Sequence, residues 1–355
     1  MCSSRLRLWR RQPRSSPGRD GSTVESVPSV GVEMEKMSQG RYLIIGGTTK
    51  AGTTSLHAYL NDHPQVCASS IKETRFFLDR DYPLEAKYRS DDGLEYYEEY
   101  FAHRGAAAVR VEATPDYLYS PGTPVRLAAA LPRAAVVFSL REPVARLVSW
   151  FRFARQSNRL PAGESFDEYV TRQFEGALPA NPPQQLRALE QGRYAGYVRR
   201  FRDVLGAERV LVTYHEDLAT DPRQVMRAIC RFAELDGTLY DGYRFTVRNR
   251  TMDLRNPRVH WWYTELRRHV TQYTHHRPLI HRPLRALRLA VDRWYLGVSA
   301  RSEPPPRCSP ATAERLAAYY ADVADDLRTL LGAPPPWPAP ATVLDHLVAG
   351  APVGP

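Results

Sequence analysis

The chain has 355 residues, a formal net charge of +10 and 43% hydrophobic residues. This content of apolar side chains is enough to bury the core of one large α/β domain or two small ones, so a globular protein is expected. The cysteines form no CxxC pair and no Cys/His pattern suited to zinc; they are Cys2, Cys67, Cys230 and Cys308. The composition therefore gives no support for a structural metal, and it favours a reducing compartment, the cytoplasm.

The two ends of the chain differ in composition from its middle. Residues 1–39 are rich in Arg, Ser, Pro and Gly and contain no apolar run long enough for a signal peptide or a membrane span. We predict a disordered leader there. Residues 336–355 are rich in Pro and Ala and are interpreted as a tail. Residues 40–335 between them are predicted to form the folded domain.

Apolar runs and helical patterns alternate along this domain. The first strand is predicted at 42–45, and further apolar runs predict strands at 109–111, 134–140 and 210–214. Helical spacing of apolar residues is found at about 56–60, 123–131, 143–156, 185–204, 221–234, 284–297 and 310–331. The alternation predicts an α/β fold of three layers, in which a central parallel sheet is flanked by helices.

The glycine-containing stretch 47–55 follows the first predicted strand and leads into a helix. Backbone N–H groups at a helix start lack intrahelical partners and attract anions, and Gly52 would let a ligand approach the backbone closely. The stretch is not a G-x-x-x-x-G-K-[ST] loop, because Thr53 stands where that pattern requires Lys. Lys50 lies within the loop instead, and no carboxylate suited to Mg²⁺ is evident, so no metal is expected. A plain structural turn is the alternative.

Arg141 and Ser149 form a second candidate anion site. Arg141 ends the predicted strand 134–140, and Ser149 lies on the helix that follows. In open α/β sheets, nucleotides bind at the carboxyl ends of the strands, where a guanidinium and a hydroxyl can hold a phosphate. The alternatives are a surface ion pair of Arg141 with Glu142 or Asp116, and a polar helix face for Ser149.

The two motifs together resemble those of sulfotransferases that use 3′-phosphoadenosine 5′-phosphosulfate (PAPS). The order and spacing of further pieces resemble the heparan-sulfate-type branch, similar to N-deacetylase/sulfotransferases, which also includes soluble bacterial members. The resemblance covers roughly residues 41–335 and implies a P-loop-like fold. The matching pieces are KAGTTSL (50–56), HPQV (63–66), KETRFF (72–77), EATPDY (112–117), LREPVARLVS (140–149), GRY (192–194), YHEDL (214–218), DP (221–222) and the helix 316–332.

The resemblance implies how the nucleotide would be held. Lys50 would bind the bridging oxygen between phosphate and sulfate, and Arg141 and Ser149 would hold the 3′-phosphate of PAPS and of its product, 3′-phosphoadenosine 5′-phosphate (PAP). Arg301 and Arg307 are candidates for completing the 3′-phosphate site. The residues implied to bind the 5′-phosphate are Lys50, Ala51, Gly52, Thr53, Thr54 and Ser55.

Glu73 would be the general base by the same resemblance. An alcohol is a poor nucleophile until its proton is removed as the bond to sulfur forms, so a base is required there. The transfer would be in-line, by analogy with phosphoryl transfer. The residues alone favour a different interpretation, an exposed loop carboxylate paired with Lys72 or Arg75. His63, which precedes a proline, is interpreted as a residue that ends a helix rather than as the base.

The acceptor is predicted from a position at which this chain differs from its relatives and from the charge of one segment. Many polysaccharide-acting relatives have a lysine at the position of Ala113, so we expect a hydroxyl of a small-molecule, glycoside or lipid-linked acceptor, as in secondary metabolism. Residues 236–300 are aromatic and basic, and residues 244–301 contain thirteen arginines and three acidic residues. This segment would cap the acceptor and favour an anionic one, unless it is simply a solvated arginine-rich surface.

Two other functions stay open. A P-loop kinase or another nucleotide phosphotransferase is disfavoured by the position of Lys50 and by the missing metal-binding carboxylate. A basic nucleic-acid-binding protein is disfavoured because the arginine-rich stretch contains no recognised nucleic-acid module. The expected partners are therefore PAPS and a hydroxylated acceptor, with no nucleic acid and no membrane span.

Overall fold

The computed structural model describes residues 40–103, 107–157, 159–176, 187–246, 253–254, 300–301 and 306–351. The predicted leader 1–39, the helix expected at 284–297 and most of the predicted cap 236–300 lie outside the described residues.

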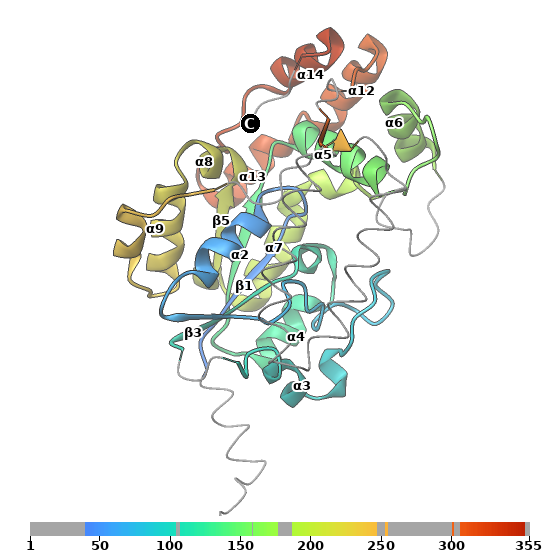
Figure 1. The fold of residues 1–355 in the computed structure, drawn as a ribbon. Coiled ribbons are helices and arrows are strands. Elements are labelled where there is room, and N and C mark those ends of the chain that lie inside the picture. The colour runs from blue at the N-terminus through green and yellow to red at the C-terminus, as the bar shows by residue number, and fades with distance from the viewer. Residues whose placement is uncertain are drawn as a thin grey trace, which may run out of the picture. The chain divides into compact units, whose positions relative to one another are not determined.

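Five parallel strands form the central sheet, in the order β2-β3-β1-β4-β5 (Figure 1). Two further short strands pair in an antiparallel manner. Because the five strands are parallel, their carboxyl ends meet at one edge of the sheet. The strands are β1 (Tyr42–Gly47), β2 (Val66–Ala68), β3 (Val109–Ala113), β4 (Ala135–Leu140), β5 (Val210–Tyr214), β6 (Asp253–Leu254) and β7 (Ala300–Arg301).

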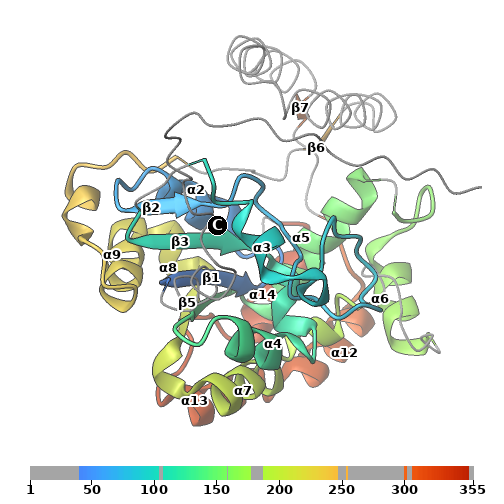
Figure 2. The same cartoon turned by 90° about the horizontal axis from the view of Figure 1, so that it is seen from below.

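Helices cover both faces of the sheet, so the predicted three-layer α/β fold is confirmed. Side chains alternate between the faces of a strand. Accordingly, Leu43 and Ile45 of β1 join one buried cluster with side chains of α2 and α9, and Ile44 joins another with side chains of α4, α5 and α7. Figure 2 shows the sheet between α2 and α7.

The helices follow the predicted pattern with some shifts at their ends. They are α2 (Thr53–Asn61), α3 (Leu94–Glu98), α4 (Thr123–Ala130), α5 (Pro143–Gln156), α6 (Phe166–Glu175), α7 (Tyr194–Leu205), α8 (His215–Thr220), α9 (Pro222–Phe232), α12 (Pro310–Tyr320), α13 (Val323–Leu331) and α14 (Pro340–Ala349). Short 3-10 helices are η1 (Ser90–Asp92), η2 (Pro115–Tyr119), η4 (Glu190–Gly192), η5 (Ala207–Arg209) and η6 (Gly237–Asp241). None of the helices in the described ranges combines the length and the apolar character needed to cross a lipid bilayer.

Several predicted elements are corrected by the structure. The single helix expected at 310–331 is divided into α12 and α13, and in the described part of the pattern at 185–204 the α-helix begins at Tyr194, after the 3-10 helix η4. Strand β2 and helix α6 were not predicted, and the three residues of β2 are too few to show a period. Residues 336–355, interpreted as a tail, contain α14, which packs against α12 and α5.

The beginning of the predicted cap also has a definite place. Helix η6 packs against α9, and Tyr240 within it is fully buried. The Tyr59 hydroxyl of α2 donates a hydrogen bond to the Thr246 carbonyl oxygen over 3.0 Å. Residues 236–246 therefore pack against α2 and α9.

Candidate active site

The loop between β1 and α2 is fixed by its neighbour β4. The Thr48 N–H donates to the Ser139 carbonyl oxygen over 2.8 Å, and the Ser139 hydroxyl donates to the Ala51 carbonyl oxygen over 2.6 Å. Gly52 has a φ of +83°, and a Cβ atom there would lie 2.7 Å from Leu218 Cδ2. Only glycine fits this left-handed, crowded position. The loop is therefore held in one conformation at the carboxyl edge of the sheet.

The start of α2 can bind an anion. Its N-cap, Gly52, offers no side-chain hydrogen bond to the helix. The orphan N–H groups of the first turn point toward the loop, at the positive end of the helix dipole. Thr53 and Ser55 are buried and Thr54 is half-buried in this first turn. The predicted 5′-phosphate segment thus lies together at one helix start.

Lys50 brings a positive charge to this loop. Its Nζ atom lies 4.6 Å from the centre of the Phe153 ring on α5. Burial, together with the smaller effects of the positive charges of Arg141, Arg152 and Lys72, lowers the pKa of Lys50 to about 8. These cations repel one another, so an anion placed among them would be stabilised.

Arg141 lies at the end of β4, next to the loop. Its Nη1 atom donates a hydrogen bond to the Lys50 carbonyl oxygen over 3.3 Å. Burial lowers the pKa of Arg141, and the nearby carboxylates of Glu216 and Glu142 act against that shift. Ser149 is half-buried on α5, two turns beyond the start of that helix. The structure therefore brings the two predicted phosphate elements into contact through Arg141.

Glu73 lies in the loop that follows β2. Its carboxylate pairs with Lys72 Nζ at 2.9 Å and with Arg75 Nη2 at 3.4 Å, and its side chain is 34% exposed. Burial alone would raise the pKa of Glu73, but the charges and hydrogen bonds of Lys72 and Arg75 outweigh it, so the pKa is lowered. Glu73 is ionised at neutral pH, as a general base must be. The pairing with Lys72 and Arg75 is also the one that the residues alone favoured.

His57 was not predicted from the sequence. It lies on α2, one turn after Thr53, so both residues share a helix face. Burial and, to a smaller extent, the charge of Lys72 lower the pKa of His57 to about 4, although the charge of Glu73 acts in the opposite direction. Its Nε2 atom is buried and has no hydrogen-bond partner within the described ranges. The sequence signal that could have identified His57 is its spacing of four residues from Thr53, which places both side chains on one face of a helix.

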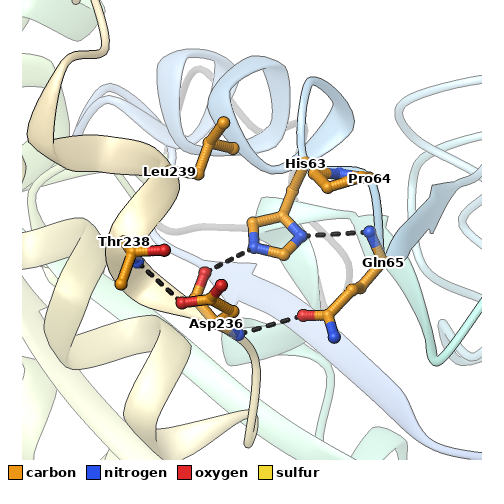
Figure 3. Close-up of a pocket in the computed structure, with 6 residues that line it drawn as sticks. All are labelled: His63, Pro64, Gln65, Asp236, Thr238 and Leu239. Carbon is orange, nitrogen blue, oxygen red and sulfur yellow. Dashed lines mark hydrogen bonds between the residues drawn. The ribbon is translucent and has the colours of Figure 1, made fainter.

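His63 lies at the opposite edge of the sheet, just before β2 begins. Its ring is 1% exposed, its Nε2 atom is 2.8 Å from the Asp236 carbonyl oxygen, and its Nδ1 atom accepts from the Gln65 N–H over 3.2 Å. Figure 3 shows these contacts around a pocket that Pro64, Thr238 and Leu239 also line. Both ring nitrogens are thus occupied, and His63 is a structural residue after α2, as predicted.

The fold and the site define a class of protein: a nucleotide-binding α/β protein with a P-loop-like fold. Its candidate anion site lies at the start of α2 and contains Lys50. Residues 41–252 match the family described as Sulfotransferase domain. The chain belongs to this family, whose members use PAPS as the sulfuryl donor.

Its relatives include heparan sulfate enzymes. The bifunctional heparan sulfate N-deacetylase/N-sulfotransferase 4 of Mus musculus is 28% identical over 200 residues, which are 54% of this chain and 22% of the mouse protein. The human N-deacetylase/N-sulfotransferase 1 is 27% identical over 205 residues, covering 56% of this chain and 22% of the human one. The resemblance to the heparan-sulfate-type branch is confirmed, although the chain matches less than a quarter of the length of these relatives.

A solved structure supports the fold. The sulfotransferase from Alicyclobacillus acidocaldarius superposes with a TM-score of 0.56 at 24% sequence identity, covering 82% of this chain and 95% of that one. This agreement shows that the P-loop-like fold expected from the resemblance is correct.

Proposed function

We propose that this chain transfers a sulfuryl group from PAPS to a hydroxyl group of an acceptor. The observation that carries the proposal is the contact between Arg141 and the Lys50 carbonyl oxygen. In this contact the guanidinium that we assign to one phosphate lies next to the loop that we assign to the other. A nucleotide with phosphates at both its 3′ and 5′ positions suits this arrangement, and PAPS is the donor that the family uses.

In this proposal each residue has one role. The loop amides and the hydroxyls of Thr53, Thr54 and Ser55 bind the 5′-phosphate, and Arg141 with Ser149 binds the 3′-phosphate. Lys50 contacts the oxygen that bridges phosphate and sulfate. With a pKa of about 8 it is mostly protonated at pH 7, which this role requires.

The transfer step is an in-line displacement. The acceptor oxygen forms a bond to sulfur while the bond between sulfur and the bridging oxygen breaks. The proton of the acceptor hydroxyl passes to Glu73, and the electron pair of the broken bond remains on the 5′-phosphate of PAP. Protonated Lys50 stabilises the charge that develops there. The ion pairs with Lys72 and Arg75 keep Glu73 deprotonated and ready to accept the proton.

The acceptor in this proposal is a small-molecule, glycoside or lipid-linked alcohol of secondary metabolism. Ala113, where many polysaccharide-acting relatives have lysine, is fully buried at the end of β3, and its N–H donates to the Lys72 carbonyl oxygen over 3.3 Å. No cationic side chain is therefore offered to a sulfated glycan at that position. A cytoplasmic location is part of the same proposal.

Two measurements test the function. Isothermal titration with PAP in the presence of EDTA should show tight binding, and ATP with Mg²⁺ should not compete. Transfer of label from radioactive PAPS to a panel of alcohols, phenols and amines then identifies the acceptor class. Binding of ATP–Mg²⁺ in preference to PAP would favour the kinase alternative instead. Affinity for nucleic acid that falls steeply with salt would favour the nucleic-acid alternative.

A further inference from the structure

The peptide that joins Arg141 to Glu142 is held from both sides. The Tyr194 hydroxyl donates a hydrogen bond to the Arg141 carbonyl oxygen over 2.7 Å. The Glu142 N–H donates to Glu216 Oε1 over 3.0 Å. This short stretch of backbone therefore has little freedom to rotate, and it carries the guanidinium that the proposed function assigns to the 3′-phosphate.

The Glu216 carboxylate is in turn held by the C-terminal part of the chain. The Trp337 Nε1–H donates to Glu216 Oε2 over 3.0 Å. One oxygen of Glu216 thus accepts from the Glu142 backbone and the other from the Trp337 indole. Burial raises the pKa of Glu216, and hydrogen bonds from Glu142 and Trp337, together with the charge of Arg141, act against that rise.

Trp337 itself is firmly placed. Its ring lies 5.9 Å from the Tyr194 ring and 5.7 Å from the Tyr214 ring, measured between centroids. It stands in the sequence Ala-Pro-Pro-Pro-Trp-Pro-Ala-Pro between α13 and α14. Prolines fix the backbone φ angle and stiffen such a segment. Helices α13 and α14 anchor its two ends by packing against α7 and α5.

We propose that Trp337 and Glu216 form a clasp that positions Arg141 for the 3′-phosphate, so that the proline-rich segment 333–340 is part of the nucleotide site. Trp337 lies beyond the residues 41–252 that match the sulfotransferase family. Both are positioning residues: Glu216 accepts from the backbone of the Arg141–Glu142 peptide, and Trp337 fixes Glu216. The inference rests on the proposed role of Arg141.

The test uses two ligands that differ only in the 3′-phosphate, namely PAP and adenosine 5′-monophosphate (AMP). Trp337→Phe keeps the aromatic packing and removes the N–H donor. It should weaken PAP binding by about 5- to 30-fold, the usual effect of losing one hydrogen bond, and leave AMP binding unchanged. Turnover at saturating PAPS should be preserved while KM for PAPS rises, because the chemical step does not use the clasp.

Further variants make the outcome decisive. Glu216→Gln should show the same selective loss of PAP affinity, and it replaces Trp337→Phe in the test if that variant does not fold. Combining Trp337→Phe with Arg141→Ala should weaken PAP binding no more than Arg141→Ala alone, because the clasp acts through Arg141.

Three results would overturn the inference. An equal loss of PAP and AMP affinity would mean that Trp337 merely stabilises the fold. Unchanged PAP affinity in Trp337→Phe, together with a large loss in Arg141→Ala, would remove the clasp and leave the proposed function intact. Unchanged PAP affinity in Arg141→Ala would contradict both the role of Arg141 in binding the 3′-phosphate and the proposed clasp.

Discussion

Arg141 and Lys50 are 91 residues apart in the sequence, yet the Arg141 guanidinium donates a hydrogen bond to the Lys50 carbonyl oxygen over 3.3 Å. The contact joins the end of β4 to the loop that follows β1, and these two strands are neighbours in the sheet. One nucleotide can therefore reach both elements. A donor with phosphate groups at both its 3′ and 5′ positions requires this proximity.

Arg141→Ala should weaken PAP binding by about 10- to 150-fold, because charge-assisted hydrogen bonds contribute about 1.5–3 kcal/mol. Isothermal titration measures the change, and a thermal melt of each variant checks that it is folded. Arg141→Lys is the matched control, because it keeps the positive charge but cannot donate the two parallel hydrogen bonds of a guanidinium. Its affinity for PAP should lie between those of the wild type and of Arg141→Ala. An unaltered affinity for PAP in Arg141→Ala would contradict the assignment.

Glu73→Gln should lower turnover by about 10²–10⁴-fold while leaving PAP binding nearly intact, the behaviour expected when a general base is lost. Single-turnover transfer from labelled PAPS measures the chemical step. His57→Gln is the companion variant, because the pKa of His57 is lowered to about 4, which leaves it neutral, and responds to the charges of Lys72 and Glu73. If Glu73→Gln kept its rate and His57→Gln lost it, the base would be His57.

Lys50 should take up a proton when PAP binds near pH 8. The pKa of Lys50 is lowered to about 8, first by burial and then by Arg141, Arg152 and Lys72, so a large fraction is neutral at that pH. A bound phosphate supplies negative charge and raises the pKa again, which draws a proton from solution. Titrations in buffers with different ionisation enthalpies count this proton.

Two variants complete that test. Lys50→Met should abolish the proton uptake, and Lys50→Arg should abolish it while retaining more of the PAP affinity, because arginine stays charged at pH 8. Proton uptake that persisted in Lys50→Met would have to come from another group. Protonated Lys50 is proposed to stabilise the leaving phosphate. Turnover in the wild type should therefore fall as the pH rises above the pKa that Lys50 has in the complex.

The architecture and the contact between Arg141 and Lys50 could be predicted from the sequence. Buried parallel strands appear as continuous apolar runs, as in Tyr42–Gly47 and Ala135–Leu140, and the strands of a parallel sheet present their carboxyl ends at one edge. Residues that directly follow such strands therefore lie at the same edge, and those of neighbouring strands such as β1 and β4 lie near each other. That rule needs no knowledge of side-chain packing.

The clasp could not be predicted in this way, whereas the pairing of Glu73 with Lys72 or Arg75 was expected because these residues are close in the sequence. The hydrogen bond from Trp337 to Glu216 spans 121 residues and depends on how α13 and α14 pack, which no local pattern encodes. The φ of +59° at Arg75 was not predicted either, because it is a backbone state that ordinary residues rarely adopt. Tertiary contacts decide both features.

His63→Ala should destabilise the protein and spare the nucleotide site. The ring links the end of α2 to the Asp236 carbonyl oxygen and to the Gln65 N–H, and it is 1% exposed. Losing these bonds and leaving buried polar groups without partners costs about 1–3 kcal/mol for each group left unsatisfied. Urea unfolding measures that loss as a lower midpoint with an unchanged slope. PAP affinity should stay at the wild-type value below the transition, because His63 lies at the opposite edge of the sheet from Lys50. A selective loss of turnover in a folded, PAP-binding His63→Ala protein would instead give this histidine a part in the chemistry.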